Sequence, residues 1–332
     1  MAFDKEKYMK IRFVAGLALI LALAFSAAAG EKFVLKLAHD QKPDQGYGPG
    51  VARFVEILKE KAGDAVEIQV FDNGVLGNER DVTEGITLGS VEMCITTLGV
   101  MMNYEPLMGA INLPFLFDGW DQVNSMFERG VMRPVFDTLA QKRKMRVLSV
   151  YALGFRNIAT NRAPIASLAD MKGLKLRVPQ APLFIDTFKA LGANPTPVPW
   201  GELYTAMQTK VVDAFENSSP VVEQFKMYEV AKYLSKTGHI WEGGCLLVSE
   251  RVFASMPQEL RTALEEAALE SAAYQRKLIQ RESDDVEAVL GGKGMAVNEL
   301  DIAPFREAVK PIHDDFIKKY GGRELIESML KP

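Results

Sequence analysis

Short apolar strand patterns and amphipathic helix patterns alternate along this chain, and that order constrains the possible folds most. In the first unit, strand patterns cover 33–38, 66–71 and 91–97, and helix patterns cover 51–63 and 79–89. A strand–helix–strand order predicts parallel strands covered by helices. A second unit begins near Phe155, and 332 residues provide enough chain for two α/β lobes.

The second unit is followed by segments that return toward the first. Strand patterns are expected at 155–161, 174–179, 194–199 and 211–215, and helices at 182–192 and 201–208. Two further strands are expected near 231–238 and 245–250. A chain that crosses between two α/β lobes more than once is typical of proteins that bind a ligand in a cleft.

A long helix pattern dominates the C-terminal third. Ser255 and Gln258 resemble a capping box, and between Pro257 and Leu290 no glycine or proline interrupts the pattern. At 1.5 Å per residue such a helix is roughly 50 Å long, more than the width of a small domain. We therefore expect it either to bend or to bridge both lobes, and to end at the glycines of 291–294.

The N-terminus predicts a secretory signal peptide over 1–29. Lys5, Lys7, Lys10 and Arg12 precede an apolar run over 13–25, and an Ala-x-Ala site follows at 27–29. The apolar run, about 13 residues, is shorter than the roughly 20 that span a membrane. Translation from either Met1 or Met9 leaves a suitable signal. A periplasmic location is expected.

Composition and motifs exclude several functions. The net charge of −4 and the absence of a basic tract argue against a nucleic-acid partner. His39, His239 and His313 are scattered, so neither a metal site nor a catalytic triad is indicated, and no cofactor is expected. Cys94 and Cys245 lie in apolar strand patterns, where buried free thiols are favoured and a disulfide stays open as an alternative.

Arg177 gives the strongest functional signal. It lies in an otherwise apolar strand, where an unpaired buried guanidinium costs several kcal/mol. Either an internal carboxylate such as Asp213 or Glu216 pairs with it, or an anionic ligand does. A guanidinium can meet a ligand carboxylate with two parallel hydrogen bonds, a geometry that lysine cannot reproduce.

Several motifs in fixed order resemble one family across most of the chain. They are NGVLGNERD at 73–81, GFRNIATNRAPI at 154–165, LKLRVP, LGANPTPVPWGELYTAMQ at 191–208 and VVDAFEN at 211–217. The chain from Phe33 to Tyr320 resembles the solute-binding subunits of tripartite ATP-independent periplasmic (TRAP) transporters, of the DctP-like kind. The resemblance implies a two-lobed α/β fold that closes on an organic acid, with a long C-terminal helix spanning both lobes. We expect 31–154 with 243–282 in one lobe, and 155–242 with 283–332 in the other.

The same resemblance implies ligand-binding residues. The family's carboxylate-clamping arginine falls on Arg177, its second arginine on Arg156, and the closing asparagine of its Asp-Gly-x-Glu-Asn motif on Asn217. The glycine of that motif is Ala214 here. The packing aromatic falls on Trp200, and polar contacts at strand ends fall on Asp40, Thr96 and Thr97.

Other candidates and alternatives stay open. Asn157, Glu79 and Trp241 are further candidate contacts. The alternatives are a strand-edge charge for Arg156, a helix cap for Asn217, core packing for Trp200 and Trp241, and a helix N-terminal charge for Glu79. If Asp40 or Glu79 lines the cleft, a hydroxylated acid such as a hexuronate is favoured over succinate.

The resulting expectation is a receptor for a small organic-acid anion, a C4-dicarboxylate or a sugar acid, that performs no chemistry. By resemblance it delivers the ligand to integral membrane TRAP permease subunits. A sensor protein with the same fold, or an enzyme acting on carboxylic acids, are the alternatives. Neither the particular acid nor the oligomeric state can be derived from the sequence.

Overall fold

The computed structural model describes residues 32–331, and the predicted signal peptide at 1–29 lies outside them. Its described strands form one nine-stranded sheet in the order β2-β1-β3-β8-β4-β7-β5-β6, with β9 paired to β8. The strands are β1 Phe33–Ala38, β2 Val66–Phe71, β3 Met93–Thr97, β4 Met145–Thr160, β5 Lys175–Val178, β6 Asn194–Pro197, β7 Ala214–Ser218, β8 Tyr233–Ser249 and β9 Ala296–Asn298.

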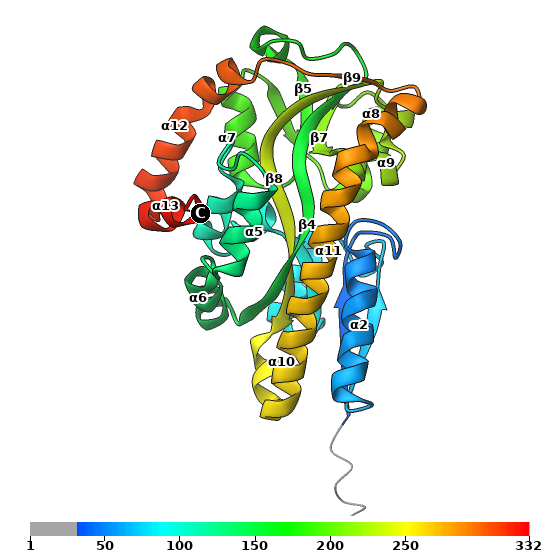
Figure 1. Cartoon of the computed structure of the whole chain (residues 1–332), viewed down its shortest axis with the longest axis vertical. Helices are drawn as coiled ribbons and strands as arrows, with labels where there is room; N and C mark the ends of the chain where they lie inside the picture. The colour runs from blue at the N-terminus through cyan, green and yellow to red at the C-terminus, as the bar shows by residue number, and fades with distance from the viewer. Residues whose placement is uncertain (1–31, 332) are drawn as a thin grey trace, which may run out of the picture.

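Two long antiparallel strands, β4 and β8, run through the middle of the molecule and join its two halves (Figure 1). One half carries β1, β2 and β3, which are parallel to one another. The other carries β5, β6 and β7, also mutually parallel. This is the predicted two-lobed α/β fold.

The strands of the first unit, β1, β2 and β3, are parallel as predicted, whereas the sheet as a whole is mixed. β8 is antiparallel to β3 and β4, and β4 is antiparallel to β7. The prediction missed the first half of β4, because 145–154 is buried along most of its length and lacks a clear alternation.

The two strands expected near 231–238 and 245–250 are one continuous strand, β8. Gly243 and Gly244 lie at its centre. A Cβ atom at Gly243 would lie 2.5 Å from the Tyr151 carbonyl oxygen, and one at Gly244 would lie 2.6 Å from the Tyr47 ring. The glycines therefore permit close packing inside a strand instead of ending it.

The helices cover both faces of the sheet. In the first part of the chain they are α2 Gly48–Ala62, α3 Glu79–Leu88, α4 Leu98–Met101, η1 Pro106–Asn112, α5 Trp120–Glu128 and α6 Arg133–Arg143. The middle carries η2 Leu168–Met171, α7 Pro182–Ala190, η3 Trp200–Glu202, α8 Leu203–Gln208, α9 Ser219–Gln224 and η4 Met227–Glu229. The C-terminal part carries α10 Glu250–Ser255, α11 Gln258–Gly292, α12 Ala303–Tyr320 and α13 Arg323–Met329.

Helix α11 contains 35 residues and packs along β4 and α2, so it bridges the two halves as expected (Figure 1). It begins three residues later than predicted. Ser255 ends the separate helix α10, and its hydroxyl group donates to the Val252 carbonyl oxygen instead of capping α11. Met256 is extended because it precedes Pro257, which excludes the helical conformation before it.

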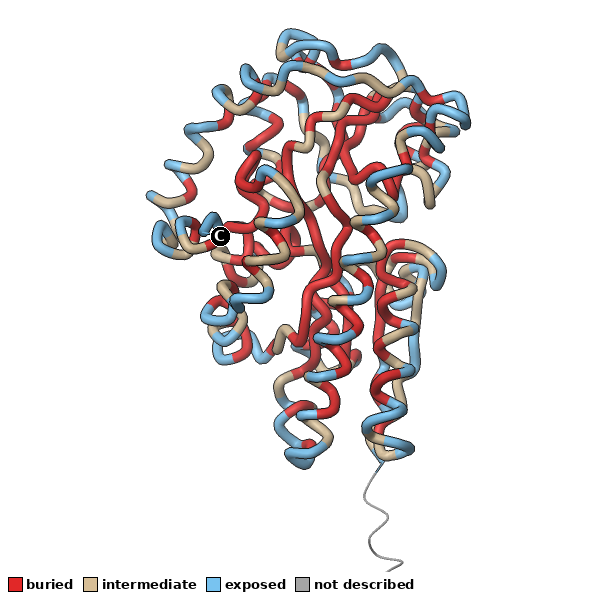
Figure 2. The backbone as a smooth tube through the Cα atoms, in the orientation of Figure 1, coloured by how far each residue is buried: buried red, intermediate tan, exposed pale blue. Residues whose placement is uncertain are grey.

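Buried residues follow the central strands and the inner faces of the helices (Figure 2). Phe316 and Met329 of the two C-terminal helices share a core with Met101 and Val123. The division of the chain between the two lobes remains a prediction. Within 32–331, no helix is both long and apolar enough to cross a membrane.

Candidate functional site

A small cavity lies where the strand ends of both halves meet beside β4 and β8. It leaves about 30 Å³ open to water-sized molecules. Its walls carry both arginines predicted for the site and several carboxyl groups. The lining residues are Asp40, Gln41, Glu79, Thr97, Leu153, Arg156, Arg177, Pro179, Trp200, Asn217, Val221 and Glu242.

Arg177 is the cavity arginine that has no ionic partner among the described residues. Its side chain comes from β5 and is 3% exposed. Nε donates to the Val198 carbonyl oxygen at 2.8 Å, and the guanidinium carbon lies 5.9 Å from the centre of the Trp200 ring. Among the described residues, no carboxylate lies within ion-pair distance of it. Burial lowers the pKa of Arg177 to about 10, so it is still charged at neutral pH.

The two internal carboxylates considered as partners for Arg177 are bound elsewhere. Asp213 pairs with the exposed Arg162 at 3.2 Å. Glu216 pairs with Arg156, whose Nη2 donates to Oε1 at 2.7 Å and to the Glu216 carbonyl oxygen at 2.6 Å, while its Nε donates to Oε2. Neither carboxylate neutralises Arg177, so its guanidinium can pair with an anion from outside the protein.

Arg156 is fully buried, so it is not a strand-edge charge. Burial alone would lower its pKa, but the charge of Glu216 and its hydrogen bonds raise the pKa above its ordinary value. Nη1 of Arg156 also donates to Asn217 Oδ1 at 3.2 Å. This network holds both side chains on the cavity wall.

Asn217 is not the N-cap of α9, because Ser218 occupies that position. Its Oδ1 also accepts a hydrogen bond from the Ser218 backbone N–H at 2.9 Å. Since Oδ1 has two donors, its amide N–H groups are the part of Asn217 that can donate to a ligand.

Three carboxyl groups form an acidic part of the cavity wall. Glu79 accepts hydrogen bonds from the Thr97 backbone N–H at 2.6 Å and the Thr97 hydroxyl group at 3.1 Å, and Asp40 accepts from the Gln41 amide at 2.9 Å. Burial raises the pKa of Asp40, and burial together with the charge of Asp40 raises the pKa of Glu79 to about 8. Burial raises the pKa of Glu242 to about 7.

Three predicted candidates lie away from this cavity. The Thr96 hydroxyl group is within 2.6 Å of the Thr83 hydroxyl group. The Asn157 amide donates to Ser219 Oγ at 2.9 Å. Trp241 packs edge-on against Trp120, with 6.3 Å between ring centres.

Five lining residues were not predicted: Gln41, Leu153, Pro179, Val221 and Glu242. Glu242 carried a usable signal, because it is a lone acid in the apolar segment Ile240–Val248, the same reasoning that identified Arg177. The other four carry no charge and could be found only from the fold.

Two further predictions from the sequence concern the cysteines and possible metal ligands. Cys94 and Cys245 are buried free thiols. The described residues contain no cluster of His, Cys, Asp or Glu that could bind a metal ion.

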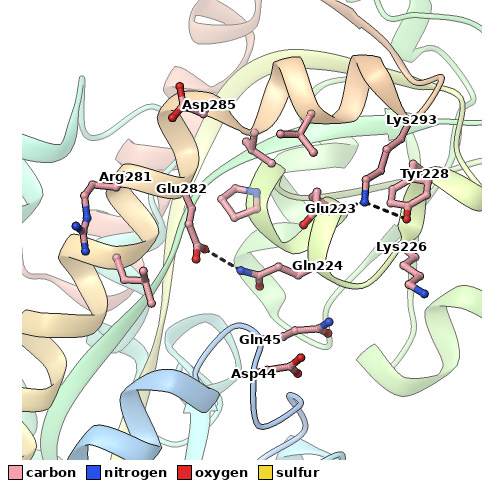
Figure 3. A pocket seen from close by; sticks show the side chains of 14 residues that line it. Asp44, Gln45, Glu223, Gln224, Lys226, Tyr228, Arg281, Glu282, Asp285 and Lys293 are labelled. Atoms are coloured by element: carbon pink, nitrogen blue, oxygen red, sulfur yellow. Dashed lines mark hydrogen bonds and ion pairs between the residues drawn. The ribbon is translucent and has the colours of Figure 1, made fainter.

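A larger groove, about 790 Å³, lies outside the cavity between α9, η4 and α11 (Figure 3). Acids and bases alternate along it, and Gln224 reaches across to Glu282 with 2.8 Å between Nε2 and Oε2. Lys293 is held at 2.8 Å by Glu223. Because its basic groups are exposed or already paired, this groove lacks the unpaired buried cation of the smaller cavity.

The two-lobed α/β fold thus encloses a buried guanidinium that has no ionic partner among the described residues. Residues 37–319 match the family of bacterial extracellular solute-binding proteins, family 7, also called DctP, and the chain belongs to this family. It is therefore one of the solute-binding proteins of TRAP transporters, which are binding proteins rather than enzymes, as its motifs predict.

Relatives match over nearly their whole length. A solute-binding protein of Roseobacter denitrificans is 30% identical over 303 residues, covering 91% of this chain and 93% of the relative. A TRAP solute-binding protein of Polaromonas sp. JS666, solved with D-erythronate, has a TM-score of 0.86 at 28% identity and covers 90% of this chain and 98% of that chain. Another, from Roseobacter denitrificans with β-D-glucuronate, has a TM-score of 0.85 at 29% identity, with 90% and 99% covered.

Proposed function

We propose that this protein captures a small organic-acid anion in the periplasm and delivers it to the integral membrane subunits of a TRAP-type secondary transporter. The observation that carries this proposal is the buried guanidinium of Arg177, which lines a cavity and has no carboxylate partner among the described residues. An anionic ligand would satisfy it.

The other predicted contacts fit the same role. Arg156 and Asn217 are held together on one wall, so their remaining N–H groups are oriented before a ligand arrives. Trp200 lies over the Arg177 guanidinium and forms an apolar wall for the ligand's carbon chain. These contacts come from β4, β5, β7 and η3, and all four residues lie within 155–242, the segment expected in one lobe. Hinge closure would bring the lining residues of the other expected lobe, Asp40, Glu79 and Thr97, against them.

The ligand class follows from the charge and from the relatives. The two solved relatives described above hold carboxylic acids, D-erythronate and β-D-glucuronate. A C4-dicarboxylate or a sugar acid therefore defines the range of ligands for this chain. Closure around such an acid would exclude water and strengthen the ionic contacts.

Substitution of Arg177 tests the clamp. Arg177→Ala should cost about 2–5 kcal/mol of binding free energy, because among the described residues that line the cavity it removes the only cation that an acid could neutralise without breaking a pair. Arg177→Lys keeps the charge but loses the planar fork, and we expect at least a tenfold (~1.4 kcal/mol) loss. Isothermal titration calorimetry with a panel of organic acids measures both.

The matched control is Arg162→Ala, which removes an exposed arginine paired with Asp213 outside the cavity. Its affinity should equal that of the unmodified protein. An unchanged affinity of the Arg177→Lys variant would contradict the two-bond contact, and an unchanged affinity of Arg177→Ala would refute the proposed site.

A further inference from the structure

Glu242 is a cavity residue whose carboxyl group is only half satisfied. It lies in β8 and is 1% exposed. Oε1 accepts hydrogen bonds from the Gly243 backbone N–H at 3.0 Å and from the Asn112 amide at 3.2 Å. Oε2 is buried and has no hydrogen-bond partner in the described part of the chain.

The surroundings hold this carboxyl group in one orientation. The amide of Asn112 that donates to Oε1 also donates to the Trp241 carbonyl oxygen at 2.9 Å, which fixes it against β8. On the other side, the backbone of Gly99 approaches the free oxygen closely, since a Cβ atom there would lie 3.1 Å from Oε2. A buried acceptor that is fixed at one oxygen and unpartnered at the other, on the wall of a cavity, is satisfied when a ligand supplies a donor.

The charges around Glu242 decide what that donor can be. Arg156 lines the same cavity, but Glu216 already neutralises it. The other acids on the wall are Asp40 and Glu79. A second carboxylate on the ligand would meet three acids here, whereas a hydroxyl group can donate to any of them without adding charge.

We propose that Glu242 accepts a hydrogen bond from a hydroxyl group of the bound acid and so selects hydroxylated monocarboxylates over C4-dicarboxylates. The inference rests on the proposed function, because it places the carboxylate of the same ligand on Arg177. It narrows the ligand range from any small organic acid to one with a single carboxylate and at least one hydroxyl group distant from it.

A ligand series of equal chain length separates the contributions. D-Erythronate has one carboxylate and hydroxyl groups, butyrate has one carboxylate and no hydroxyl group, and succinate has two carboxylates. D-Glucuronate extends the hydroxylated class to six carbons. By calorimetry, the unmodified protein should bind at least one hydroxylated acid roughly 100-fold or more tightly than succinate and butyrate.

Two variants separate charge from geometry. Glu242→Gln removes the negative charge and replaces one carboxylate oxygen with an amide N–H donor. It should lower the affinity for the hydroxylated acid at least tenfold and change the affinity for butyrate by less than about threefold. The affinity for succinate should rise. Glu242→Asp keeps the charge, but its shorter side chain moves the carboxylate oxygen away from the ligand. It should lower the affinity for the hydroxylated acid and still bind succinate poorly. Glu202→Gln, an exposed acid near Trp200, controls for the loss of one negative charge.

The outcomes are distinguishable. If succinate binds the unmodified protein as tightly as the hydroxylated acids, or if Glu242→Gln weakens butyrate as much as D-erythronate, the selectivity is refuted while the proposed function stands. If no acid binds, the proposed function falls, and this inference falls with it. Thermal unfolding of each variant shows whether a loss of affinity is a loss of folding.

Discussion

Arg156 and Arg177 are two buried guanidinium groups on one cavity wall, and their neighbours give them different roles. Glu216 neutralises Arg156, whereas the Arg177 guanidinium has only the Val198 carbonyl oxygen as a hydrogen-bond partner among the described residues. Sequence reasoning could identify both positions, since a charge in an apolar strand is visible in the chain. It could not assign Glu216 to one of them, because that depends on the antiparallel pairing of β4 with β7.

Glu242, which was not predicted as a site residue, shows the same limit of sequence reasoning. Trp241 and Glu242 are neighbours in β8, and side chains of consecutive strand residues point to opposite faces. Trp241 packs against Trp120 on one face, and Glu242 lines the cavity on the other. The strand is visible in the sequence, but which of its two faces meets the cavity is set by distant segments.

The buried acids predict a pH dependence of stability. Burial raises the pKa of Glu79 to about 8 and of Glu242 to about 7, so the folded protein binds protons that the unfolded chain releases near pH 4.5. Unfolding free energy therefore falls as pH rises from about 5 to 8 through these groups. Thermal unfolding of the ligand-free protein across that range measures the effect.

The Glu79→Gln and Glu242→Gln variants should each show a shallower decline than the unmodified protein. If both variants lost stability with rising pH as steeply as the unmodified protein, other groups would be the cause of the pH dependence. Glu282, whose pKa burial also raises, lies in the outer groove, so Glu282→Gln is the comparison for an acid away from the cavity.

At the scale of elements, α11 is attached to the sheet where strand pairing is irregular. The register of β4 against β8 shifts between Ala152 and Gly154. The Ala152 backbone N–H donates to Gln275 Oε1 at 2.7 Å, and Gln275 Nε2 donates to the Ala152 carbonyl oxygen at 2.8 Å and to that of Gly46 at 3.1 Å. One helix side chain thus replaces hydrogen bonds that a regular ladder would supply.

Gln275→Leu should lower the free energy of unfolding by about 2–4 kcal/mol, because it leaves buried backbone groups without partners. Urea denaturation measures the change. Tyr274→Ala is the control on the same helix, since Tyr274 is 44% exposed, and it should change stability by no more than about 0.5 kcal/mol. Equal losses in the two variants would contradict the role given to Gln275.

The sequence pattern predicts α11 well, apart from its first three residues, because a run without glycine or proline needs no tertiary information. It gives no indication of the contact with Ala152. A polar residue within the helix stripe reads as exposed until the irregular strand beneath it is known, and the missed first half of β4 is that strand.

At the scale of the whole molecule, the loop at 41–47 contacts α9. The Gly46 backbone N–H donates to Gln224 Oε1 at 2.9 Å, and Lys42 lies 5.5 Å from the Phe225 ring centre. Gln224 also donates to Glu282 of α11. These contacts join a segment expected in the first lobe to one expected in the second.

Gln224→Ala should raise the dissociation constant of the bound acid about 3–10-fold, mainly through faster dissociation. The contact contributes about 1 kcal/mol to the closed form and nothing to an open one. Surface plasmon resonance or stopped-flow kinetics resolves the two rates. Gln208→Ala, which changes an exposed glutamine in α8, serves as the control. A slower association with unchanged dissociation would contradict the role given to the Gln224 contact.

β4 and β8 each run continuously from one half of the molecule into the other. Dividing the chain into two fragments at residue 154 would interrupt β4 within its hydrogen-bonded ladder. Each fragment would then expose an unpaired strand edge. Opening of the cleft would therefore twist both strands. The resistance to opening then depends on the curvature of β4 and β8 and not on the length of a flexible linker.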